Sequence, residues 1–171
     1  MSQDSENIIR QLKGGLIVSC QPKPDSPFKG PRAMALFARA AEIGGACAIR
    51  ANGPADIRAI RQATSLPIIG INKIARSGWA VYITPTLRSA HPLLRAGASI
   101  IAADATSRPH PGGLTAAEFI GLLARELAVP IMADVATVEE GLAAADAGAS
   151  LVATTMAGYT DARPAIGGPD L

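Results

Sequence analysis

The stretch Leu66-Pro67-Ile68-Ile69-Gly70-Ile71-Asn72-Lys73 shows the pattern that decides the fold. Four residues without a polar side chain follow the proline, and a polar pair ends the run. Such an unbroken run is typical of a strand that is covered on both faces, as the strands of parallel sheets are. The stretch therefore predicts one strand of a parallel sheet. Its polar end should lie at the edge where such proteins form their sites.

Five further runs of the same kind occur, and the starts of all six lie roughly 20 to 32 residues apart. They are Leu16–Cys20, Cys47–Arg50, Ser99–Ala103, Ile131–Ala133 and Leu151–Thr154. Helical patterns fill four of the intervals, at 33–43, 54–63, 115–127 and 137–147. Alternating strands and helices with short connections predict an α/β protein with a parallel sheet and right-handed crossovers.

The residues that introduce the strands alternate along the chain. Gly-Ala pairs at 45–46, 97–98 and 148–149 precede the second, fourth and sixth runs, whereas Pro67 and Pro130 precede the third and fifth. A two-unit repetition suits a (β/α)8 TIM barrel, whose core layers draw on alternate strands. Six strands leave a doubly wound sheet open as the alternative. We expect one domain over residues 1–171, a TIM barrel with about six of its eight β/α units.

Composition and charge exclude several classes of protein. Hydrophobic residues make up 49% of the chain and aromatic residues only 4%, so the core should be aliphatic. A net charge of +2 gives no support to nucleic-acid or membrane-surface binding. No apolar run approaches the length of a membrane span, and the N-terminus is polar rather than signal-like. We therefore expect a cytoplasmic protein.

The cysteines and histidines indicate neither a disulfide nor a metal site. Cys20 and Cys47 fit buried, reduced thiols, possible neighbours on adjacent strands. His91 and His110 lie far apart, in a predicted helix and a predicted loop, so a structural zinc site has no support. We expect no metal and no organic cofactor.

Polar side chains follow the predicted strands at the point where each strand ends. They are Gln21, Arg50, Asn52, Lys73, Asp104, Asp134 and Thr155. Because the carboxyl ends of parallel strands share one rim, we expect these groups to converge there.

Three residue types at this rim suggest chemistry, and each has a structural alternative. Desolvation would pull the pKa of Lys73 toward about 7–8 and make it a base, unless its ammonium simply reaches solvent. The Arg50 guanidinium suits a carboxylate or phosphate, in a ligand or in an internal salt bridge. Asp104 and Asp134 fit contacts to the lysine or to a sugar hydroxyl, or helix caps. Tyr159, in a predicted loop at 158–160, would close over a ligand or pack.

Six segments together resemble the N-acetylmannosamine-6-phosphate 2-epimerases, in the same order along nearly the whole chain from Leu12. The segments are Gly15–Gln21, Ile49–Gly53, Leu66–Ile71, Val81–Thr86, Asp104–Thr106 and Thr154–Thr160. The resemblance implies a TIM barrel of the ribulose-phosphate-binding kind. It also implies interconversion of N-acetylmannosamine 6-phosphate and N-acetylglucosamine 6-phosphate during sialic acid breakdown, by proton removal and return at C2.

The resemblance further implies roles for individual residues. Lys73 falls on the family's catalytic lysine, and Gln21, Arg50 and Asp134 fall on substrate-binding positions. Asp104 and Tyr159 match further motif positions that we count as substrate-binding candidates. The expected partner is a small phosphosugar. Asn72 departs from the family's usual aliphatic residue.

The family pattern continues with two further strands, which bring a catalytic glutamate in an Ala-Glu-Gly-Arg-like segment and a glycine-rich phosphate loop. Neither segment occurs in these 171 residues. We therefore expect open sheet edges, self-association or poor solubility, and little turnover by this chain.

Two other functions fit the same residues. A lysine at a barrel strand end also suits a Schiff-base aldolase. A non-catalytic or vestigial sugar-phosphate-binding barrel would need only the binding groups.

Overall fold

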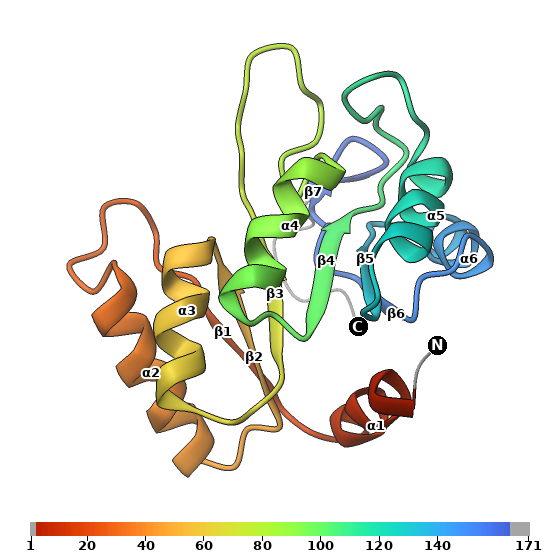
Figure 1. The fold of residues 1–171 in the computed structure, drawn as a ribbon. Helices are drawn as coiled ribbons and strands as arrows, with labels where there is room; N and C mark the ends of the chain where they lie inside the picture. The colour runs from red at the N-terminus through yellow and green to blue at the C-terminus, as the bar shows by residue number, and fades with distance from the viewer. Residues whose placement is uncertain (1–2, 165–171) are drawn as a thin grey trace.

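Six parallel strands form one curled sheet, in the order in which they occur in the sequence. The computed structural model describes residues 3–164. The strands are β1 (Ile17–Cys20), β2 (Ala48–Asn52), β3 (Ile68–Ile71), β4 (Ile100–Asp104), β5 (Ile131–Asp134) and β6 (Leu151–Ala153). Figure 1 shows the sheet curving, with β1 and β6 at its two edges. The predicted α/β fold, a partial (β/α)8 barrel with six units, is confirmed.

Five helices alternate with the strands and cover the outer face of the sheet (Figure 1). They are α2 (Pro31–Ile43), α3 (Pro54–Ala63), α4 (Leu87–Ala96), α5 (Ala116–Glu126) and α6 (Val138–Asp146). Capping boxes start α5 at Thr115 and α6 at Thr137, in agreement with the predicted helices. His91 was expected in a helix, but the bounds of α4 were not predicted because Pro92 interrupts its pattern; a third capping box, at Thr86, starts the helix.

A sixth helix, α1 (Gln3–Leu12), precedes the barrel and was also missed in the sequence. Its Leu12 is buried and its Ile8 packs against the apolar cluster inside the barrel, which includes Ile17 and Ala48 at the beginnings of β1 and β2. Helix α1 therefore covers the amino-terminal end of the sheet. The opposite end, where the polar residues gather, stays accessible.

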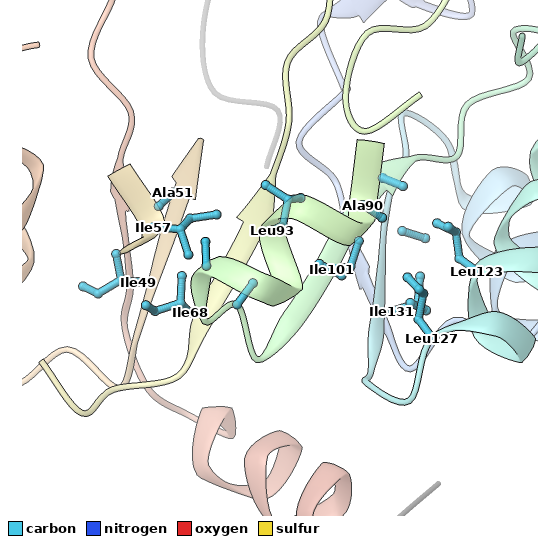
Figure 2. Packing of buried hydrophobic residues seen from close by; sticks show 14 of the residues in the cluster. Ile49, Ala51, Ile57, Ile68, Ala90, Leu93, Ile101, Leu123, Leu127 and Ile131 are labelled. Atoms are coloured by element: carbon cyan, nitrogen blue, oxygen red, sulfur yellow. The ribbon is translucent and has the colours of Figure 1, made fainter. Parts of the chain in front are cut away.

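The core divides into two layers because neighbouring residues of a strand point to opposite faces. In β3, Ile68 belongs to the cluster between sheet and helices, whereas Ile69 and Ile71 belong to the cluster inside the barrel. Figure 2 shows the outer layer, in which Ile57 and Leu93 of the helices meet the strands. The side chains are aliphatic, as the composition predicted.

Gly70 lets helices and sheet approach closely. A Cβ atom at this position would lie 2.8 Å from the Cβ of Ala98 and 3.1 Å from Cδ1 of Ile57. Its backbone needs no special conformation, so the requirement is for space alone. The glycine in the run that predicts the fold is thus a packing position.

The expectation of a loop at 158–160 was wrong. Strand β7 (Tyr159–Thr160) pairs in antiparallel fashion with β8 (Arg163–Pro164). The two strands have two residues each, which is too short for an alternating pattern to show in the sequence.

Candidate active site

A cavity of about 550 Å³ opens into the barrel at the carboxyl ends of the strands. Residues of five strands or of the segments directly after them line it: Ile17, Ser19, Gln21, Arg50, Ile69, Lys73, Met132, Ala153 and Thr155. Within each strand these residues lie two or four positions apart, so all of them share the inner face. The predicted convergence of polar strand ends is therefore observed for Gln21, Arg50, Lys73 and Thr155.

Arg50 and Asp134 meet across the interior of the barrel. Arg50 Nη2 donates to Asp134 Oδ2 at 2.6 Å, although β2 and β5 are separated by two strands in the sheet. The Asp134 carboxylate is completely buried, and Thr155 Oγ1 donates to its other oxygen at 2.8 Å. Arg50 Nη1 lies 3.4 Å from the Met132 sulfur. Arg50 therefore forms an internal salt bridge and can also bind a ligand, since its ion pair with Asp134 lies at the cavity.

Lys73 lies just beyond β3 and its side chain is exposed at the cavity mouth. Partial desolvation lowers its pKa below the usual lysine value of 10.5; the positive charge of Arg50 lowers it further, and Asp134 opposes the shift. Within the described residues its amine forms no hydrogen bond or ion pair. Both predictions for Lys73 therefore hold: its amine reaches solvent, and its lowered pKa favours the neutral form that can act as a base.

Backbone contacts fix the position of Lys73. Its N–H donates to the side-chain oxygen of Asn52 at 2.8 Å, and the residue forms an antiparallel bridge with Ile83. The chain thus doubles back after β3, in the segment that rises beyond the sheet in Figure 1.

Thr84 holds the returning segment between β3 and β4. Its N–H donates to the Asn72 carbonyl, and its hydroxyl donates to the Ala102 carbonyl at 2.6 Å and accepts from the Asn72 N–H at 3.1 Å. The residue is fully buried with a φ of 45°, which is unfavourable for a β-branched side chain. The backbone strain at Thr84 is therefore held in place by three hydrogen bonds.

Asp104 is engaged by its own loop. Its completely buried carboxylate accepts from the N–H and hydroxyl of Thr106 and from Arg108 Nη2 at 2.7 Å. Asp104 is not among the residues that line the cavity. The structure thus brings Gln21, Arg50, Lys73 and Tyr159 to the cavity wall, with Asp134 directly behind Arg50.

Gln21 and Tyr159 lie at the mouth. Gln21 Nε2 donates to the Ser19 hydroxyl at 2.6 Å, which leaves its carbonyl oxygen available as an acceptor. Tyr159 is 72% exposed, although it also lines the cavity. Packing into the core is thereby excluded as the role of its ring.

Tyr82 and Arg108 were missed as site residues in the sequence. Tyr82 lines the cavity, and Arg108 forms an ion pair with the buried carboxylate of Asp104. Tyr82 stands in one of the six motif segments, but it follows no strand run. Arg108 stands four residues after Asp104 in a loop, and only the short spacing of these opposite charges could have indicated their ion pair.

Charged side chains also gather at another cavity of the described residues. A cavity of about 590 Å³ between the ends of α2 and α3 contains Arg39, Glu42 and Arg61, but these charges are already bonded to protein groups. In residues 3–164 no cluster of three acidic, cysteine or histidine side chains is placed to hold a metal ion. The helices of that same region are all too short or too polar to cross a bilayer.

A sequence model of the family described as "Putative N-acetylmannosamine-6-phosphate epimerase" matches residues 34–171. A protein from Cutibacterium acnes is 47% identical over 170 residues, which are 99% of this chain and 73% of that protein. A protein from Caldanaerobacter subterraneus is 47% identical over 165 residues, or 96% of this chain and 70% of that protein. Both are named "Putative N-acetylmannosamine-6-phosphate 2-epimerase".

A solved structure agrees with the sequence matches. The N-acetylmannosamine-6-phosphate 2-epimerase from Clostridium perfringens superposes with a TM-score of 0.85 at 40% sequence identity. The match covers 91% of this chain and 68% of that one. Sequence and fold therefore point to the same family.

Proposed function

Because this chain belongs to the N-acetylmannosamine-6-phosphate epimerase family, we propose that it interconverts N-acetylmannosamine 6-phosphate and N-acetylglucosamine 6-phosphate. The reaction removes the proton at C2 of the open-chain sugar and returns one to the opposite face. The single observation that supports this most is a lysine amine of lowered pKa at the mouth of a strand-end cavity, beside a buried arginine–aspartate pair.

In this proposal Lys73 takes the C2 proton. The hydrogen is acidic because it lies α to the C1 aldehyde, and a neutral amine is the form that accepts it. Desolvation and the nearby Arg50 charge both favour that neutral form. The reaction requires proton movement only, with no change in oxidation state.

The remaining candidates orient the substrate. Arg50 keeps N–H groups beyond those bound to Asp134 and Met132, and these suit a sugar or phosphate oxygen. Gln21 offers its carbonyl oxygen, and Tyr159 covers the mouth. Asp134 holds the Arg50 guanidinium, and Asp104 holds Arg108.

The expected setting follows from the same family. We place the reaction in the use of N-acetylmannosamine from sialic acid, with a small phosphosugar as partner. A cytoplasmic site is supported by the free thiols of Cys20 and Cys47.

The test is exchange of the C2 hydrogen in D₂O, followed by NMR with N-acetylmannosamine 6-phosphate. We expect slow incorporation of deuterium at C2, slow appearance of the second epimer, in keeping with the little turnover expected of this chain, and loss of both in Lys73→Ala. Calorimetric titration with the same sugar phosphate separates binding from turnover. Binding without exchange would support the non-catalytic barrel, and borohydride trapping of sugar on Lys73 would support the aldolase. Either result would contradict the epimerase.

A further inference from the structure

Tyr82 is a polar residue of the cavity lining that has no role in the reaction proposed above. Its ring packs against the apolar cluster inside the barrel, next to Ile83 and the cavity. Among the contacts of residues 3–164, its hydroxyl has no hydrogen-bond partner, although the side chain is half-buried. A half-buried phenol that lines a cavity without a partner is a donor available to a ligand.

The backbone on both sides of Tyr82 is fixed, which makes its position well defined. The Ile74 N–H donates to the Tyr82 carbonyl at 2.9 Å, and the Asp104 N–H donates to the Ile83 carbonyl at 3.0 Å. Thr84 completes the attachment through the hydrogen bonds described above. The same pairing that positions Lys73 therefore positions Tyr82 within one rigid unit.

The surroundings keep the Tyr82 phenol neutral. Burial raises its pKa, and the negative charges of Asp104 and Asp134 raise it further, whereas Arg108 opposes the shift. Asp134 acts on Tyr82 and also on Lys73, so both groups lie near the same carboxylate. A neutral phenol donates a hydrogen bond without competing with lysine for the role of base.

We infer that Tyr82 is a further catalytic residue, whose hydroxyl donates a hydrogen bond to the C1 oxygen of the open-chain sugar. This inference rests on the proposed epimerase reaction. As the C2–H bond breaks, its proton passes to the Lys73 amine, and its electron pair forms the C1–C2 double bond. The C1=O electrons move onto oxygen, where the enolate charge is stabilised by the Tyr82 O–H. A solvent proton delivered to the opposite face of C2 restores the carbonyl, Lys73 releases its proton to solvent, and the phenol proton stays on Tyr82 throughout.

Tyr82→Phe tests the role because it removes only the hydroxyl. Removing a single donor to a developing oxyanion costs about 10² to 10³ in kcat. We expect a loss of that size in C2 exchange, a change in KM of less than about threefold, and an unchanged melting curve. The control is Trp79→Phe, on the same segment but outside the cavity lining, which should keep the exchange rate of the parent chain. Exchange by Tyr82→Phe within a factor of about two of the parent would overturn the inference.

A second measurement detects contact between Tyr82 and the sugar phosphate and does not depend on turnover. The chain has two tyrosines, so 3-fluorotyrosine labelling gives two ¹⁹F resonances, and Tyr82→Phe identifies one of them. Addition of N-acetylmannosamine 6-phosphate should shift the Tyr82 resonance. If the parent chain exchanges C2 hydrogen and this resonance does not move, Tyr82 has no contact and only this inference fails. If the parent chain neither binds nor exchanges, the proposed function fails, and Tyr82 with it.

Discussion

Replacing only one partner of the buried Arg50–Asp134 ion pair should lower the stability of the fold substantially. In Arg50→Met the Asp134 carboxylate stays completely buried and keeps only Thr155 as a side-chain donor. Removing one partner of a buried ion pair costs about 3–5 kcal/mol, because the remaining charge is uncompensated. At roughly 2–4 °C per kcal/mol for a domain of this size, Arg50→Met should melt about 6–20 °C below the parent chain.

Replacing both partners should have a much smaller effect. In Arg50→Met/Asp134→Leu no charge is left unpaired, and apolar replacements of buried pairs are often neutral or stabilising. We therefore expect the double variant to regain most of the lost melting temperature while C2 exchange stays absent. That result would show that the pair is present for function rather than for stability.

The assay is thermal and urea unfolding followed by circular dichroism, for the parent chain, both single variants and the double variant. The four free energies of unfolding form a double-mutant cycle and give the coupling energy of the pair. A melting temperature of Arg50→Met within about 2 °C of the parent chain would refute the reasoning, because it would mean that water screens the Asp134 charge.

Three further outcomes follow from single positions. Because the pKa of Lys73 is lowered, its neutral amine forms at lower pH than in free lysine, and kcat should rise with pH at a midpoint below 10.5. Asp134→Asn should move that midpoint to lower pH, since the Asp134 charge raises the Lys73 pKa. A midpoint at or above 10.5 in the parent chain would contradict this. Gly70→Ala should cost about 1–3 kcal/mol in urea unfolding, since its Cβ would lie 2.8 Å from Ala98, and Ala98→Gly should restore part of the loss. Thr84→Val removes the hydroxyl that pairs with the buried Ala102 carbonyl and the part-buried Asn72 N–H, and it should cost about 1–3 kcal/mol in the same assay. Thr84→Ser should remain near the parent; equal costs would exclude the hydroxyl as the cause.

Self-association has a structural basis at the edges of the sheet. Large apolar side chains are exposed on α2, beside β1, and on α6, beside β6; they include Leu36, Ile43, Val138 and Leu142. Sedimentation velocity should therefore detect association of the 171-residue chain that Leu142→Glu reduces. A single monomeric species across the concentration range would contradict this expectation.

The strand runs predicted the fold correctly because each strand is covered on both faces. Ile68, Ile69 and Ile71 had to be apolar in succession, since one side meets helices and the other fills the barrel. Helix α1 escaped prediction because its sequence is polar, and the bounds of α4 were not predicted because Pro92 obscures its pattern. The helices with clear caps, such as the one after Thr137, were found within a residue or two.

The amino-acid sequence by itself determined which residues form strands and helices, and which polar residues stand at the strand ends. Those features depend on the local alternation of side chains and on capping groups a few residues apart. The tertiary structure decided which of those polar groups meet. Arg50 finds Asp134 at a separation of 84 residues, and the bridge between Lys73 and Ile83, formed when the chain reverses, brings Tyr82 to the same cavity as Lys73. Such contacts depend on the curvature of the whole sheet, which no local pattern specifies.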